Sequence, residues 1–231
     1  MGNAAAKELK ATVIENGSIE PSMSISPSLV STAATEAKVS GMMEKTWTNS
    51  ETGDVLFKMK GKGMIKSHTL IFDALGKEIA TIIIFKKQMR SCVQYICKSE
   101  PTFDGQEALP AEELKRAGID EGAVLYVFAI LESQMEGMGG AQSVYSVVTG
   151  KEGDDFTKTQ VYTGEKLSAM NFYAVFKAGD TPVAKASMKG MSFNPTVEAG
   201  AGVDILAIIN VGYSLVGDGS SAGALAGAGV V

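Results

Sequence analysis

Few side chains in this 231-residue sequence stand in an arrangement typical of acid–base, nucleophilic or metal chemistry. The single histidine, His68, would have to serve any Ser-His-Asp or Cys-His site, and it begins an apolar run that predicts a strand start. A zinc site would need several Cys or His ligands at suitable spacing, which the sequence does not offer. No spacing of Lys, Asp, Glu or Tyr nominates an acid–base pair. We therefore expect a protein that is not an enzyme, with no catalytic residue, metal or cofactor.

The two cysteines, Cys92 and Cys97, argue against a disulfide. If SCVQYIC forms a strand, the odd spacing of five residues places them on opposite faces. Without a cysteine framework or a signal-peptide pattern, a reducing compartment is expected. The sequence thus predicts a cytoplasmic protein.

Basic residues gather in one part of the chain. Residues 58–98 hold nine basic and two acidic residues, a net +7, whereas residues 99–165 hold four basic and thirteen acidic residues, a net −9. The overall charge of −5 argues against nucleic acid as a partner. A basic surface would attract anionic phosphates, although an ordinary solvated strand face carries lysines too. The candidate residues for binding an anionic lipid headgroup are Lys58, Lys60, Lys62, Lys86, Lys87 and Arg90.

The start of the chain, MGNAAAK, resembles an N-myristoylation signal. Removal of Met1 would expose Gly2, the predicted lipidation site, although Ala6 stands where the motif has Ser or Thr. One myristoyl chain binds membranes only marginally, with an association constant on the order of 10⁴ M⁻¹, and needs a second signal such as a basic surface. Acylation of Gly2 together with the lysines would supply both signals.

The first 44 residues predict a flexible arm, because they are rich in Ser, Thr, Ala, Pro and Glu and show no sustained apolar period. Beyond them, Phe57 and Met59 alternate with Lys58 and Lys60, so the two lysines share the outer face of a strand. HTLIFDALGKEIATIIIF predicts a β-hairpin around DALGK, with SCVQYICK as its neighbour.

Further short strands are predicted at AVLYVFAIL, VYSVVT, TQVYTG, NFYAVFK and PVAKASMKG, and a short surface helix at residues 107–118. Many short strands at close spacing favour a sandwich or a barrel. The last 14 residues, 218–231, form a Gly- and Ala-rich segment that we expect to be loose.

VDILAIINVGYSLVG, residues 203–217, predicts a helix buried on every side. Its apolar residues, among them Ile205, Ile208 and Ile209, surround the helix instead of forming one stripe, and Asp204 is a suitable N-cap. The helix is shorter than the ~20 residues that cross a bilayer. We therefore predict a structural helix and no transmembrane span.

Three stretches resemble the LURP-one-related family of the tubby C-terminal-like superfamily, which also includes the phospholipid scramblases. GDVLFKMKGKG is similar to its opening strand, TLIFDALGKEIATI to its hairpin, and VEAGAGVDILAIINVGYSL to its closing strand, glycine turn, Asp and helix. The resemblance covers residues 45–217. It implies a mainly β (α+β) domain, a closed antiparallel barrel of about twelve strands around a buried hydrophobic C-terminal helix.

In the tubby branch of that superfamily, basic residues on the barrel surface hold phosphoinositide headgroups. The resemblance therefore implies a non-enzymatic, membrane-peripheral lipid-binding module at the cytoplasmic face of the plasma membrane. The alternative is a protein–protein scaffold, or a defence- or stress-response protein, without lipid binding. Scramblase activity is less favoured, because no acidic calcium-binding loop of the scramblase type is recognisable. The sequence gives neither the physiological ligand nor the oligomeric state.

Overall fold

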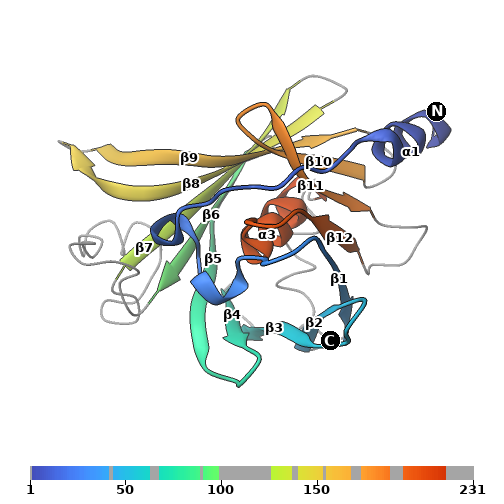
Figure 1. The fold of residues 1–231 in the computed structure, drawn as a ribbon. Coiled ribbons are helices and arrows are strands. Elements are labelled where there is room, and N and C mark those ends of the chain that lie inside the picture. The colour runs from blue at the N-terminus through green and yellow to red at the C-terminus, as the bar shows by residue number, and fades with distance from the viewer. Residues whose placement is uncertain are drawn as a thin grey trace.

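Most of the residues that the computed structural model describes lie in β-strands (Figure 1). It describes residues 2–41, 44–62, 68–88, 91–98, 126–136, 140–152, 155–167, 173–187 and 195–216. The strands in these ranges are β1 (Thr35–Ser40), β2 (Glu44–Asn49), β3 (Val55–Lys62), β4 (His68–Asp73), β5 (Glu78–Gln88), β6 (Ser91–Lys98), β7 (Tyr126–Glu136), β8 (Gly140–Glu152), β9 (Asp155–Lys166), β10 (Tyr173–Ala178), β11 (Thr181–Ser187) and β12 (Thr196–Ala199). The helices are α1 (Gly2–Ala11), the 3-10 turns η1 (Pro21–Met23) and η2 (Pro27–Leu29), and α3 (Ile205–Val216).

Neighbouring strands of the sheet run antiparallel. From β2 to β12 each strand pairs with the next one along the chain, which is the order of a meander. β1 lies between β2 and β12 and pairs with both, so the order of neighbours closes on itself. The expectation of a mainly β, antiparallel fold is confirmed.

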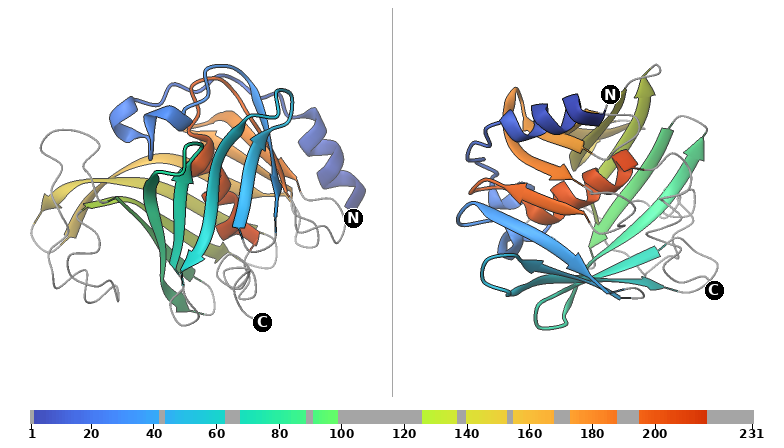
Figure 2. Two further views of the ribbon diagram at one scale, coloured as in Figure 1. Left: turned by 90° about the horizontal axis from the view of Figure 1, so that it is seen from below. Right: turned by 90° about the vertical axis from the view of Figure 1, so that its right-hand side faces the viewer.

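The C-terminal helix α3 lies within the curve of the sheet (Figures 1 and 2). Every residue from Ile205 to Val211 is buried. They share one apolar core with inward side chains of the strands, including Trp47 and Phe57, whose rings stack with centroids 6.0 Å apart. No helix of the described ranges is long and apolar enough to cross a bilayer. The prediction of a helix buried on every side is therefore confirmed for Ile205 to Val211.

The predicted hairpin is formed by β4 and β5. At the turn Asp73 N donates to Lys77 O over 2.9 Å, and Asp73 Oδ1 accepts hydrogen bonds from Leu75 N (2.9 Å) and Lys77 N (2.8 Å). An aspartate that bonds its own turn in this way is typical of a tight chain reversal. β6 pairs with β5 as predicted.

The prediction that residues 1–44 form a flexible arm was wrong for the residues that the structure describes there. Helix α1 buries Ala5 and Leu9 and contacts β10, and β1 is an integral strand of the sheet. Between them runs an extended segment, the strap (residues 12–31), which crosses the fold in Figure 1. Its backbone bonds join segments about 170 residues away, so a local sequence pattern cannot reveal them.

Three hydrogen bonds illustrate how the strap is held. Glu15 N donates to Pro182 O (2.9 Å), Gly17 N to Ala201 O (2.7 Å), and Ser31 N to Val203 O (2.9 Å). The strap also places Ile25 and Leu29 in the core. It is therefore a structural part of the fold.

The predicted helix at 107–118 and the loose segment at 218–231 lie outside the described residues.

Candidate functional site

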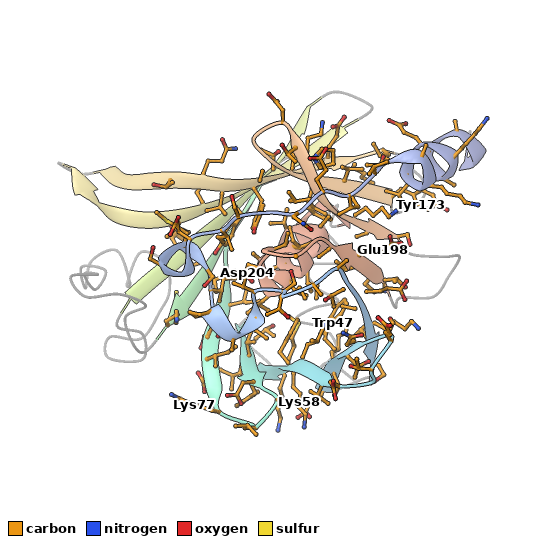
Figure 3. The ribbon with its side chains drawn as sticks, in the orientation of Figure 1. Trp47, Lys58, Lys77, Tyr173, Glu198 and Asp204 are labelled. Carbon is orange, nitrogen blue, oxygen red and sulfur yellow. The ribbon has the colours of Figure 1, made fainter. Side chains whose placement is uncertain are left out.

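The outer face of β3 carries the first of the predicted lipid-binding residues. Phe57 and Met59 are buried, whereas Lys60 is exposed and Lys58 half-exposed, as the alternation predicts. Lys58 projects along the lower edge of the molecule in Figure 3. Its Nζ lies 3.9 Å from Glu44 Oε1, a long ion pair between exposed side chains. Such a pair contributes about 0–1 kcal/mol, so Lys58 remains available to an anion.

The strand register brings three more of the predicted positions to one end of the sheet. Lys62 pairs with His68 on β4, and His68 pairs with Ile83 on β5. The backbone of Lys86 and Lys87 follows Ile83 towards the same end of β5. Lys62, Lys86 and Lys87 thus come from strand ends on the same side, with β4 between them. Their side chains lie outside the described part.

The two other predicted sites are not joined to this group. Arg90 lies outside the described residues. Gly2 is the first residue of α1, which docks on β10 through Ala5 and Leu9. The helix that begins at the predicted lipidation site therefore packs beside β10, whereas Lys58 and Lys60 lie on β3.

A cavity of about 410 Å³ opens near Lys58, where η2, the β2–β3 turn and the β4–β5 turn meet the first turn of α3. This volume lies within the range of small-molecule sites, roughly 300–1,000 Å³. The apolar lining residues are Leu29, Val30, Val55, Leu56, Ala74, Leu75 and Ile205. Leu75 is 94% exposed at the tip of the β4–β5 turn.

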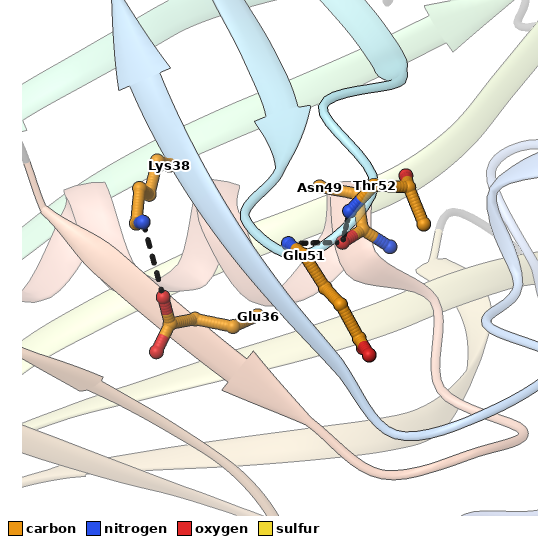
Figure 4. A network of polar contacts seen from close by, with 5 residues as sticks. All are labelled: Glu36, Lys38, Asn49, Glu51 and Thr52. Carbon is orange, nitrogen blue, oxygen red and sulfur yellow. Dashed lines mark hydrogen bonds and ion pairs between the residues drawn. The ribbon is translucent and has the colours of Figure 1, made fainter.

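Most polar side chains that line this cavity form hydrogen bonds within the protein. Asn49 Oδ1 accepts from Glu51 N (2.8 Å) and Thr52 N (3.2 Å), which holds the β2–β3 turn (Figure 4). Thr35 Oγ1 donates to Ala33 O over 2.9 Å.

Three more polar residues of the wall are committed in the same way. Asp73 Oδ1 binds its own turn, Ser28 Oγ contacts Ser26 Oγ at 2.9 Å, and Ser31 Oγ donates to Val203 O over 3.1 Å. A cavity in which most polar side chains already have a partner within the protein favours an apolar ligand group.

Asp204 forms a buried junction between the strap and α3. Its Oδ1 accepts from Ala207 N (3.0 Å), which is the N-cap bond that the sequence predicts, and its Oδ2 accepts from Ile25 N (2.6 Å). Asp204 N in turn donates to Tyr162 Oη over 3.2 Å. One carboxylate therefore caps the central helix and fixes the strap.

Burial raises the pKa of the Asp204 carboxyl to about 6, although the N–H donors and the charge of Lys98 act in the opposite direction. Lys98 Nζ donates to Ile25 O over 2.9 Å, so it also holds the strap. The hydroxyls of Tyr145 and Tyr162 face this junction from β8 and β9, and burial raises the pKa of both. Their rings stack with centroids 5.8 Å apart. The junction therefore has a structural role, because it joins the strap to α3 and to the sheet.

The described residues contain no cluster of three or more His, Cys, Asp or Glu that could hold a metal ion. The Cys97 thiol is free and buried, and burial raises its pKa to about 12. A thiol with so high a pKa is a poor nucleophile, because the thiolate is the reactive form.

The comparisons with known proteins support the fold. No family model and no curated protein sequence matches this chain. Among solved structures, it is similar to the X-ray structure of an Arabidopsis thaliana protein, with a TM-score of 0.51 over 84% of this chain and 94% of that one. The two chains are 14% identical, so the likeness shows a shared fold alone. Membership of the LURP-one-related family stays a prediction from the three sequence stretches.

Sequence reasoning missed the cavity. Its wall combines residues of η2, β1, two turns and α3. Residues 28–35 lie in the stretch whose composition predicts a flexible arm. One signal was available: Leu75 is a large apolar residue in the middle of the predicted turn DALGK, a place where polar residues are usual.

Proposed function

We propose that this protein binds anionic lipid headgroups at a membrane surface, without catalysing a reaction, through the outer face of β3. The observation that carries the proposal is the pair of outward lysines, Lys58 and Lys60. Lys62 follows two residues later on β3, at the end of the sheet where Lys86 and Lys87 lie on β5. Lysines near an anionic membrane surface contribute about 1 kcal/mol each to binding.

The proposal includes acylation of Gly2 and a location at the cytoplasmic face of the plasma membrane. A single acyl chain and a basic surface are each weak and together give stable attachment. The fold shared with the Arabidopsis structure and the three family-like stretches support a place in the LURP-one-related family. Intact-mass measurement of the protein from its native cells tests the acylation, because loss of Met1 and addition of a myristoyl group to Gly2 change the mass by a known amount.

Vesicle cosedimentation tests the lipid binding. The comparison uses phosphatidylcholine vesicles with and without phosphoinositide, and a triple variant Lys58→Gln, Lys60→Gln and Lys62→Gln. We expect the unaltered protein to prefer the phosphoinositide vesicles. The variant should lose on the order of 100-fold in partitioning, because three lysine contributions are removed.

A matched control removes the same charge elsewhere: Lys38→Gln, Lys166→Gln and Lys177→Gln, on β1, β9 and β10. Lys38 forms an exposed ion pair with Glu36 at 3.7 Å (Figure 4), so the fold should tolerate its loss. This control should bind as the unaltered protein does. If the two triple variants lose the same affinity, only net charge matters, and if no form binds, the scaffold alternative replaces the proposal.

A further inference from the structure

We infer that the cavity beside β3 takes the apolar chain of an anionic amphiphile whose headgroup is held at Lys58 and Lys77. The inference rests on the proposed function and deepens it, because it assigns a site to the part of the lipid that a surface lysine cannot bind. Its basis is an apolar cavity wall that includes Leu56 and Leu75, each of which has a lysine two residues further along the chain, Lys58 and Lys77.

The cavity wall selects for an apolar group. Leu29 and Ile205 are 7% and 4% exposed, and Leu56 and Leu75 complete the wall towards the surface. Because most polar side chains of the wall bond within the protein, a polar ligand group would gain few hydrogen bonds there. Burial of apolar area contributes roughly 25 cal/mol per Å², which favours a hydrocarbon chain.

The rim supplies the charge. Lys58 follows Leu56 on the same outer face of β3, ~6.7 Å along the strand. Lys77 is exposed two residues after Leu75 in the β4–β5 turn. Both lysines lie along the lower edge of the molecule in Figure 3. A chain lying between Leu56 and Leu75 would therefore leave its headgroup next to two ammonium groups.

Asp73, which lines the cavity, and Glu44, which pairs with Lys58, are the acidic residues in direct contact with this site in the described ranges. Asp73 lines the cavity, but its carboxylate accepts the N–H groups of Leu75 and Lys77. Glu44 holds Lys58 only at 3.9 Å between exposed side chains, and a phosphate can compete for that contact. The hydrocarbon chain of the ligand therefore lies in the cavity, and its anionic headgroup lies outside the cavity.

The test compares two probes by calorimetry: inositol trisphosphate, which is a headgroup alone, and a dioctanoyl phosphoinositide below its micelle concentration. The unaltered protein should bind the dioctanoyl lipid about tenfold or more tightly than the headgroup, because chain burial adds to charge attraction. Leu75→Asn and Leu56→Asn should bring this ratio close to 1 while the headgroup affinity stays unchanged.

Val13→Asn is the matched control, because Val13 is 75% exposed and lies on the strap, outside the cavity wall. It should keep the ratio of the unaltered protein. Equal affinity of the unaltered protein for the two probes, or a ratio that survives both leucine substitutions, would overturn the inference and leave the proposed function standing. Binding of neither probe would overturn both.

Discussion

Asp204 is the residue on which two parts of the fold depend. It is fully buried, yet it accepts the backbone N–H groups of Ile25 and Ala207. Removing the carboxylate leaves at least one buried donor without an acceptor, which costs about 1–3 kcal/mol. The sequence predicts the bond to Ala207, because an N-cap is a local pattern, but not the bond to Ile25, which spans 179 residues.

The pKa of Asp204 gives a pH dependence with a definite sign. The folded value of about 6 lies above the ordinary 3.8, so the folded state holds its proton more tightly than the unfolded state. The contribution of Asp204 to stability is therefore greatest below pH ~4, falls as the pH rises from ~4 to ~6, and is constant above. Tyr145 and Tyr162 stay neutral throughout this window, because burial raises the pKa of both above the ordinary value of 10.

Urea unfolding of the unaltered protein and of Asp204→Asn over this pH range measures the effect. The variant should be less stable at every pH, and its deficit should shrink between pH ~4 and ~6, because only the unaltered protein loses stability through Asp204. The other carboxyl groups cancel in the difference. A deficit that stays constant or grows with pH would contradict the account.

The strap is the element that the sequence pattern could not predict. It has no apolar period, and it is held by backbone bonds to Pro182 and to residues 201–203. Gly202 has a φ of +74°, and a Cβ on it would collide with Gly17 O on the strap. The fit of the strap therefore requires glycine at position 202, both for its backbone conformation and for the close approach.

Substitution Gly202→Ala should lower the melting temperature and speed proteolysis within the strap, at a cost above ~1 kcal/mol. Gly53→Ala is the matched control. It has a similar φ of +79° but open space around the position of a Cβ. Equal effects of both substitutions on melting and on strap proteolysis would show that the contact with Gly17 does not matter.

Helix α3 was predictable, because apolar residues all around a short helix require burial on every side. Ile208 is fully buried within the sheet. Substitution Ile208→Asp should abolish cooperative thermal unfolding followed by circular dichroism, because an unpaired buried charge costs a large part of a typical stability of about 5–15 kcal/mol. Val13→Asp, at an exposed position, should leave the transition unchanged. A native-like transition in Ile208→Asp would contradict the buried position of α3.

At the scale of the whole molecule, the sequence predicts which strand residues face inward or outward. It does not predict features that are formed by segments far apart in the chain. The inward Phe57 and Met59 and the outward Lys58 and Lys60 follow from a period of two residues. The cavity does not, because its wall joins segments from residue 28 to residue 205. The lysines of the candidate site on β3 could therefore be predicted from the sequence, whereas its apolar cavity could not.

The salt dependence of vesicle binding tests the central claim most directly. Exposed lysines attract anionic headgroups through a field that salt screens over about 10 Å at 0.1 M and about 3 Å at 1 M. Cosedimentation with phosphoinositide vesicles should therefore weaken tenfold or more as the salt rises from about 0.1 M to about 1 M, and vesicles of phosphatidylcholine alone should bind little at either concentration. Binding that does not depend on salt, or that is equal for the two kinds of vesicle, would contradict the account.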